Sequence, residues 1–355
     1  MAVGGAQKFL VSLVNSLDIE IFTILVISLS GRNALQSEVN EHIMFIPLPR
    51  NRKIDRKTIF TLRNILLDFE PHCVFCLGAY PFFIVNVASF FSNRFKKIIS
   101  YHITVPLNGK QDKLHKLYFS LLKKKDIIIT VSKNQEIYTA RRYKVPENKF
   151  KTIHNGIDIN QWTLPTKDFS RTNLRANYGL LPDSKVIIIA ANLRPEKNHL
   201  GAIESLKILH DTHKLMASLL IVGDGVVLDK LKELVAQTNL SSYVIFTGEQ
   251  KDVRPFYWIS DLFTLTSKKV ETFSIAALEA MACGLPAVLT DIGGANEMIV
   301  EKLNGLLCSP DETDISEKWY AALTMPFDNV KISQDIHKKF NHTDMVTKYE
   351  TILIK

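Results

Sequence analysis

Two glutamates stand in and beside an otherwise apolar segment, VETFSIAALEAMACGLP (270–286). From Ser274 to Cys283, apolar or small residues lie nearly all the way round a predicted helix, and such a helix is normally buried. Glu279 falls in its middle and Glu271 precedes it. A buried carboxylate without a partner is costly, so each needs donors. The two hydroxyls of a ribose would satisfy Glu279, and so would a core arginine; the residues alone leave both interpretations open.

The start of this helix is suited to phosphate. Thr272, Phe273 and Ser274 lie there, and the first N–H groups of a helix lack intrahelical acceptors and carry partial positive charge. Gly284 and Pro286 end the helix and lead back into a strand. A ligand that carries both phosphate and hydroxyl groups would therefore fit this segment.

Short apolar strands alternate with helical patterns along the whole chain, which predicts an α/β protein with doubly wound parallel sheets covered on both faces. A length of 355 residues suits two domains. The polar stretch 158–173 lacks periodicity and contains Pro165, so we expect domains at 1–162 and 163–339. The expected strands lie in residues 22–29, 43–48, 73–78, 98–103, 127–132, 151–156, 185–190, 218–225, 243–248, 262–267 and 286–291.

The chain starts with a glycine pair and an amphipathic pattern, MAVGGAQKFLVSLVNSL. In doubly wound folds such a glycine turn follows the first strand, which lies in the middle of the sheet. We therefore expect that roughly ten to twenty further residues, one strand and its approach, precede this sequence in the native protein. A longer upstream reading frame is then expected to raise solubility and stability.

Positive charge is concentrated in the first half. Residues 1–162 contain 23 lysines and arginines against 12 acidic residues, whereas residues 163–355 contain 21 against 24. This asymmetry predicts an anionic partner, such as a phospholipid surface or a phosphorylated acceptor. No nucleic-acid-binding motif is present, so nucleic acid is not expected as a partner.

The sequence contains no apolar run of the roughly 20 residues that span a bilayer, and its start lacks the pattern of a signal peptide. We expect a cytoplasmic protein with peripheral contact at the inner face of the cell membrane. Cys73 and Cys76 form C-x-x-C in a strand-like segment without a second ligand pair. They are interpreted as buried thiols, and no metal is expected.

The motifs around the two glutamates resemble the glycosyltransferase group-one family, family four of the sugar-nucleotide transferases, whose members are retaining enzymes with the two-domain GT-B fold. The resemblance covers nearly the whole chain and is strongest over 185–310. Its motifs are GGAQKFL, IHNGID (153–158), AANLRPEKNH (190–199), IVGDG (221–225), VIFTGEQKDVRPFYWISDLFTLTS (244–267), E-x7-E, and AMACGLPAVLTDIGGANEMIVEKLNGLL. It implies two Rossmann-like domains facing across a cleft, with a final helix at about 340–355 packing back on the first domain.

The resemblance implies roles for the acidic segment. Glu279 would hold the nucleotide ribose and Glu271 the hydroxyls of the transferred sugar. Backbone amides at Thr272, Phe273 and Ser274 would bind the distal phosphate.

It also implies cations for the diphosphate leaving group. Lys197 matches one member of the family's basic pair, and Arg194 would replace the second, because Asn192 occupies the usual arginine position. Fixed cations there stabilise the charge that develops on the leaving phosphate. The family uses them in place of a metal, and the chain has no D-x-D triplet.

Four further residues follow from the same resemblance. Gly4 and Gly5 would let the backbone approach the diphosphate. His102 would lie near the transferred sugar, and Asp224 would belong to the nucleotide-binding loop.

The expected function is therefore transfer of a sugar from a nucleotide-diphosphate sugar, with no other cofactor, to a glycan or a polyprenyl- or lipid-linked acceptor. Surface polysaccharide synthesis (capsule, O-antigen or lipopolysaccharide) is the expected pathway. Two alternatives stay open: a non-catalytic partner subunit of the same fold, and a UDP-sugar epimerase. A nicotinamide-dependent dehydrogenase is disfavoured, because no G-x-G-x-x-G follows a strand.

Overall fold

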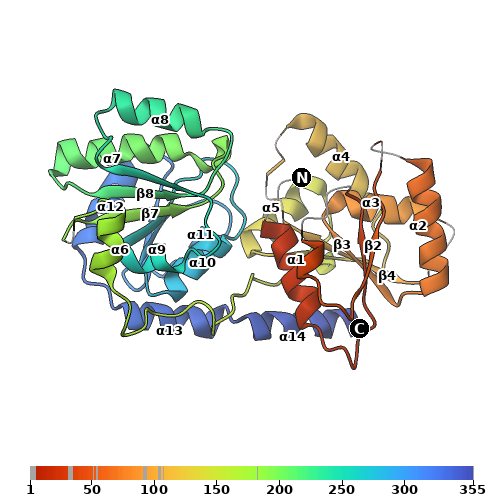
Figure 1. Ribbon diagram of the computed structural model, residues 1–355. Helices are drawn as coiled ribbons and strands as arrows, with labels where there is room; N and C mark the ends of the chain where they lie inside the picture. The colour runs from red at the N-terminus through yellow and green to blue at the C-terminus, as the bar shows by residue number, and fades with distance from the viewer. Residues whose placement is uncertain are drawn as a thin grey trace. The chain divides into compact units, whose positions relative to one another are not determined.

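A computed structural model describes residues 5–30, 35–50, 52, 55–90, 94–102, 105–106, 108–181 and 183–354. The chain divides into two compact units (Figure 1). Unit 1 contains Met1–Asn155 and Thr343–Lys355, and unit 2 contains Gly156–His342. Among the described residues, no helix is both long and apolar enough to cross a bilayer.

Unit 1 contains parallel strands in two ladders. One is the pair β1 (Leu25–Ser28) and β2 (Met44–Pro47). The other is a sheet with the order β3-β4-β5-β6, formed by Cys73–Leu77, Lys96–Tyr101, Ile127–Thr130 and Phe150–Thr152.

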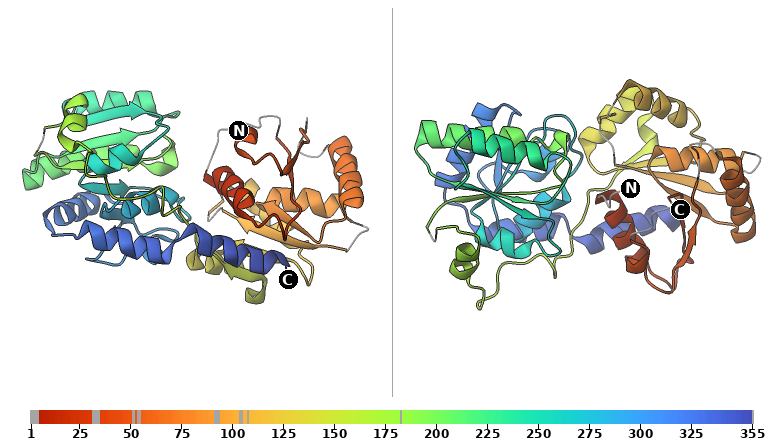
Figure 2. Two further views of the ribbon diagram at one scale, coloured as in Figure 1. Left: turned by 60° about the horizontal axis from the view of Figure 1, so that its bottom comes forward. Right: turned by 45° about the horizontal axis from the view of Figure 1, so that its top comes forward.

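Helices cover both faces of the four-stranded sheet (Figure 2). On one face, the core around Phe82, Ile99 and Phe119 lies beneath α2 (Arg56–Phe69), α3 (Ala79–Ala88), α4 (Gly109–Phe119) and α5 (Lys133–Tyr143). On the other face, Phe9 and Tyr349 come from α1 (Gly5–Ser16) and α14 (His342–Ile354). Two short 3₁₀ turns, η1 (Gln36–Glu38) and η2 (Glu147–Lys149), complete the unit.

Unit 2 contains a six-stranded parallel sheet with the order β12-β11-β10-β7-β8-β9. Its strands, in chain order from β7, are Val186–Ala190, Ser218–Val222, Val244–Gly248, Leu262–Leu265, Ala287–Thr290 and Gly305–Cys308. Every residue of the central strands β7 and β10 is buried, as continuous apolar runs predict for a sheet covered on both faces. The strand order reverses between β7 and β10, and such a switch point opens a crevice at the carboxyl ends of the strands.

The helices of unit 2 connect these strands. In chain order they are α6 (Arg171–Asn177), η3 (Pro195–Lys197), α7 (His199–His213), α8 (Leu228–Gln237), α9 (Arg254–Ile259), α10 (Ile275–Ala282), α11 (Ala295–Met298), α12 (Glu312–Thr324) and α13 (Asn329–Lys339). The helix expected in the glutamate segment is α10. Ser274 caps its start, and Gly284 follows its end at φ +84°, a conformation that favours glycine.

The units divide at Asn155/Gly156, whereas the polar stretch predicted a boundary after Trp162. Residues that follow Gly156 pack within unit 2: the carbonyl oxygen of Trp162 accepts a hydrogen bond from His337 at 2.7 Å, and that of Thr163 accepts one from the indole of Trp258 at 2.8 Å. Polarity marks a segment as exposed, but these backbone contacts decide to which unit it belongs.

Candidate active site

The loops that follow β7 and β10 meet at the switch point of unit 2. Lys197 ends η3 on the first loop, and Glu271 lies on the second, just before α10. The ammonium of Lys197 lies 2.6 Å from Oε2 of Glu271, and their side chains are only 24% and 15% exposed. The structure thus joins two of the residues that the sequence marked, although they are 74 positions apart.

Further contacts hold the Glu271 carboxylate in place. The hydroxyl of Ser267 donates to Oε2 at 3.3 Å, and the N–H of Thr272 donates to Oε1 at 3.3 Å. Beneath the loop, Gly293 has φ +60°, and a Cβ at that position would lie 2.1 Å from the carbonyl oxygen of Glu271. Only glycine fits so close an approach. A cavity of about 10 Å³, the size of a single water, is lined by Glu271, Ser274 and neighbouring residues.

Thr266, which directly follows β10, holds the turn that carries Lys197. The Thr266 hydroxyl donates to the carbonyl oxygen of Asn198 at 3.0 Å and lies 3.3 Å from that of Lys197. Asn198 adopts a left-handed conformation (φ 54°) and accepts a hydrogen bond from the N–H of Gly201, so it caps α7. The two loops are therefore held together by backbone contacts as well as by the ion pair.

The glycines of the IVGDG segment serve close packing. A Cβ at Gly223, whose φ is +139°, would lie 2.2 Å from the carbonyl oxygen of Ala191 in the loop after β7. Asp224 is exposed, and its carbonyl oxygen accepts a hydrogen bond from the N–H of Leu193 at 2.9 Å. Arg194 is also exposed on this loop. The segment thus shapes the loop that carries the two expected cations.

The residues at the start of α10 are held firmly. The Ser274 hydroxyl accepts a hydrogen bond from the N–H of Ala277 at 3.2 Å, while the carbonyl oxygen of Thr272 accepts one from the N–H of Gly294 at 2.7 Å. The buried ring of Phe273 packs on Phe340 with the centroids 5.5 Å apart. The helix start is therefore rigid, and the dipole of α10 places partial positive charge there.

Glu279 is half-buried on α10 beside Tyr257 and Cys283. Burial raises the pKa of Tyr257 well above its ordinary value, and the charge of Glu279 makes a second, smaller contribution in the same direction. The same two causes raise the pKa of Cys283 to about 12. Tyr257 lies on α9, the helix that precedes α10 in the chain, and no pattern in the sequence marked it as a neighbour of Glu279.

Comparison with known proteins places the chain in a family. The profile of glycosyl transferases group 1 matches residues 170–339, and that of glycosyltransferase family 4 matches residues 3–161. The chain belongs to the glycosyltransferase group-one family. It is therefore a glycosyltransferase by descent, and the family works with nucleotide-sugar donors.

The chain shares less than a third of its aligned residues with individual relatives. The chain is 29% identical over 271 residues, 73% of its length and 68% of the relative, to the N-acetyl-alpha-D-glucosaminyl L-malate synthase of Bacillus anthracis. It is 28% identical over 191 residues, 53% of its length and 48% of the relative, to the UDP-Gal:alpha-D-GlcNAc-diphosphoundecaprenol alpha-1,3-galactosyltransferase of Escherichia coli. The aligned part thus spans about two thirds of one relative and half of the other.

The solved structure of Anabaena Alr3699/HepE in complex with UDP superposes with a TM-score of 0.83 at 19% identity, covering 99% of this chain and 96% of that one. This likeness confirms the GT-B fold. Within this fold of the group-one family, the pair formed by Lys197 and Glu271 lies in the C-terminal Rossmann-like unit.

A buried histidine next to Lys197 was not anticipated. His199 is 1% exposed, and among the described residues neither ring nitrogen has a hydrogen-bond partner; the same holds for Nδ2 of Asn198. Burial and the nearby charge of Lys197 lower the pKa of His199 to about 4. Two unsatisfied buried polar groups beside the expected phosphate site are a feature that sequence patterns do not reveal.

Of the remaining expected residues, His102 and Gly5 lie in unit 1, and Gly4 lies outside the described residues. Nε2 of the half-buried His102 is 2.9 Å from the Ser100 hydroxyl, and its ring packs on Phe9 at 4.8 Å. Burial lowers the pKa of His102 to about 4, so the ring is neutral at pH 7 and suited to hydrogen bonding. Nothing described lies within 4 Å of a Cβ at Gly5, so internal packing does not demand glycine there.

The described residues contain no cluster of three or more His, Cys, Asp or Glu side chains that could hold a metal ion. Cys76 is buried in β3 and Cys73 is half-buried. Burial raises the pKa of both thiols, that of Cys76 to about 12. Both cysteines are therefore protonated thiols at neutral pH.

Proposed function

We propose that the protein is a retaining, metal-independent glycosyltransferase that transfers a hexose from a nucleotide-diphosphate sugar to a glycan or lipid-linked acceptor in surface polysaccharide synthesis. One observation carries the donor site: Lys197 and Glu271 meet at 2.6 Å where the loops after β7 and β10 converge. A phosphate and a sugar hydroxyl bound there would each find a partner of the right charge.

Donor binding would exchange the partners of this pair. The ammonium of Lys197 would move to the distal phosphate, joined by Arg194 and by the first N–H groups of α10. Glu271 would then accept hydrogen bonds from the sugar hydroxyls, and Glu279 from the ribose. The polar contacts of Glu271 with Ser267 and Thr272 support this role, because they keep the carboxylate in place once the lysine leaves.

In the transfer step, the bond between the anomeric carbon and the distal phosphate oxygen breaks. The acceptor hydroxyl oxygen bonds to the anomeric carbon on the same face, and its proton passes to the leaving phosphate. Negative charge develops on that phosphate, and a preorganised cation stabilises it without reorganisation. The Thr266 contacts hold the backbone of the turn that carries Lys197, so the lysine side chain starts from a fixed position.

The proposed acceptor is anionic. The two relatives above are named for L-malate and for a diphosphate-linked polyprenol, both of which carry negative charge. The first half of this chain has an excess of 11 positive charges, 23 against 12. A basic acceptor-side unit would attract such a substrate over the distance of a Debye length.

The donor site can be tested by thermal unfolding of the full chain with UDP, GDP and ADP and their sugar conjugates, without added metal. A ligand that binds the folded state raises Tm by mass action. We expect one base to be selected, with the shift lost in Lys197→Met and Glu279→Gln and kept in Lys268→Met. No shift with any nucleotide would contradict the donor site and favour the partner-subunit alternative. Product formed from donor alone would favour the epimerase.

A further inference from the structure

Much of the positive charge of unit 1 lies in the segment that forms one layer of helices. Residues 55–149 contain 17 lysines and arginines against 7 acidic residues, an excess larger than the net +8 of the whole chain. This segment includes α2, α3, α4 and α5, which cover the same face of the sheet. The outer surface of these four helices is called the basic layer below.

Many cations of the basic layer are exposed. They are Arg56, Lys57 and Arg63 on α2, Lys110, Lys113 and Lys116 on α4, Lys133, Arg141 and Arg142 on α5, and Lys124 and Lys144 in the segments that follow α4 and α5. The cations lie on α2, on one side of the uncharged helix α3, and on α4 and α5 on the other side. Their combined field is felt by an extended anion more than by a single phosphate.

The acidic residues of this segment offset the charge only in part. Asp126 is fully buried and pairs with the equally buried Lys97 at 3.8 Å, so this pair contributes no net charge outside. Glu136 is buried on α5 and pairs with Lys133. Asp112 pairs with Arg142, while Asp68 and Glu147 are exposed. The surface therefore stays strongly positive.

Large apolar side chains stand among these cations. Phe60 on α2 is 65% exposed, Phe90 just after α3 is 73% exposed, and Leu117 on α4 is 51% exposed. Leu67, Val87 and Ile137 add smaller exposed areas on the same helices. Cationic helices that present phenylalanine and leucine to solvent are typical of surfaces that lie in the headgroup region of a bilayer.

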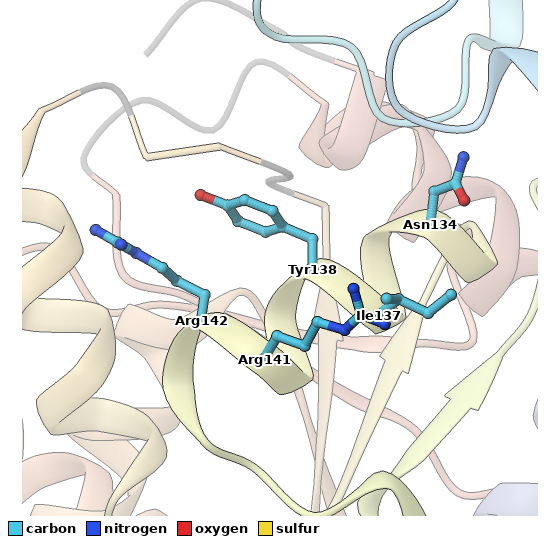
Figure 3. A pocket seen from close by; sticks show the side chains of 5 residues that line it. All are labelled: Asn134, Ile137, Tyr138, Arg141 and Arg142. Carbon is cyan, nitrogen blue, oxygen red and sulfur yellow. The ribbon is translucent and has the colours of Figure 1, made fainter.

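One face of α5 presents cationic and apolar side chains next to one another (Figure 3). Asn134, Ile137, Tyr138, Arg141 and Arg142 line an open hollow of about 480 Å³ on the outer side of that helix. Arg142 is held by two hydrogen bonds to the carboxylate of Asp112 on α4, which fixes α5 to its neighbour. The two arginines point to opposite sides of this helix face, and Arg141 lies beside Ile137 (Figure 3). A phosphate headgroup bound by the guanidinium group of Arg141 would therefore have an aliphatic side chain next to it.

We propose that the basic layer docks the protein on an anionic lipid bilayer. This inference rests on the proposed function, because a lipid-linked acceptor is presented at such a surface. The exposed phenylalanines favour lipid over nucleic acid, since the phosphate backbone of a duplex offers anionic groups to the lysines and arginines but no apolar medium for Phe60 and Phe90. Binding is therefore expected to have a salt-sensitive part and a salt-insensitive part.

Vesicle flotation of the full chain tests the proposal. We expect binding to phosphatidylcholine vesicles that contain phosphatidylglycerol, and none to pure phosphatidylcholine. Each lysine near an anionic surface contributes about fivefold in partitioning, so Lys110→Glu with Lys113→Glu is expected to weaken binding about 25-fold or more. Both changes place glutamate in the first turns of α4, where the helix dipole favours it. Phe60→Ser with Phe90→Ser is expected to remove the binding that persists at high salt.

Matched controls lie in unit 2. Lys230→Glu with Lys232→Glu makes the same charge change on exposed positions of α8, and Val226→Ser removes an apolar side chain that is 85% exposed. These variants are expected to bind vesicles as the unaltered protein does. An equal loss in the α8 variant, or binding to RNA without binding to vesicles, would overturn the proposal.

Nucleotide-induced shifts in Tm, measured on the same preparations, separate the two proposals. A protein that responds to a nucleotide but ignores anionic vesicles overturns the docking surface and leaves the donor site standing. A protein that binds vesicles through the basic layer but responds to no nucleotide overturns the proposed function and leaves the docking surface standing.

Discussion

Removing the ion pair between Lys197 and Glu271 should cost little stability and much activity. The pair is neither fully exposed nor fully buried, at 24% and 15% exposure. Exposed pairs contribute about 0.2–1 kcal/mol, and breaking a buried pair costs about 3–5 kcal/mol. We therefore expect a coupling free energy of about 1–2 kcal/mol from a double-mutant cycle of Lys197→Met and Glu271→Gln, read from urea unfolding.

Turnover should fall by about 100-fold or more in Lys197→Met, because the cation at the leaving phosphate is lost. A stability loss of about 1–2 kcal/mol leaves a typical domain almost fully folded, so it cannot account for such a decrease. The assay is release of nucleoside diphosphate from the donor sugar that gives the largest shift in Tm, with and without acceptor.

A neighbouring pair provides the control. Lys268 and Glu312 lie 2.8 Å apart, are 49% and 25% exposed, and tie the same loop to α12. Lys268→Met with Glu312→Gln is expected to show a coupling below about 1 kcal/mol and to leave turnover within a few-fold of the unaltered protein. If both pairs reduce turnover equally, Lys197 and Glu271 merely hold the loop, and the reasoning is refuted.

Three other changes test the surroundings of the site. Gly293→Ala forces a Cβ towards the carbonyl oxygen of Glu271 and is expected to lower the free energy of unfolding by several kcal/mol. Gly179→Ala is the control, because Gly179 has φ +67° with nothing within 4 Å of its Cβ position, and it should cost only about 1 kcal/mol in chemical denaturation. Equal costs for the two variants would contradict the close-packing argument. Thr266→Val removes the hydroxyl that holds the turn before α7, so it is expected to lower the free energy of unfolding by about 1 kcal/mol and to weaken nucleotide binding. Unchanged nucleotide affinity would show that the turn needs no such support. His199 has a pKa of about 4 in the folded protein against 6.5 for the free side chain, so it takes up a proton more readily in the unfolded state. The free energy of unfolding should therefore fall by about 3 kcal/mol in total as the pH drops from 6.5 to 4. The variant His199→Leu should show a shallower decline over this range, and an identical pH profile would contradict the burial of a neutral ring.

Local patterns in the sequence predicted much of unit 2 correctly. α10 begins at Ile275 after the Ser274 cap and ends before Gly284, because capping and a left-handed turn depend on neighbours within one helical turn. Each of the apolar runs expected as strands overlaps one, although β4 and β6 begin before the expected runs 98–103 and 151–156. Strand β12 (Gly305–Cys308) was not expected, since only four residues of NGLLC pair with β11 and so short a run resembles a loop.

The candidate site was only partly predictable. Residue types and the family resemblance marked Lys197, Glu271 and Glu279, but the contact between the first two depends on the reversal of strand order between β7 and β10. Tyr257 beside Glu279 and the unsatisfied ring of His199 were not found from the sequence. Both features depend on how separate elements pack together. The periodicity of a helix indicates that one face is buried, but it does not identify the element that covers this face.

The sequence by itself determined the α/β class, the family, the capped helix with its two carboxylates and the excess of positive charge in the first half. These follow from composition, from spacing within one element and from motif order along the chain. Only the tertiary structure decided that Lys197 and Glu271 pair, that Gly293 underlies them, and that the positive charge gathers with exposed phenylalanines on one layer of helices. The physical reason is that these features depend on which loops and faces the sheet topology brings side by side. Local sequence patterns do not predict which strands pair over long separations in the chain.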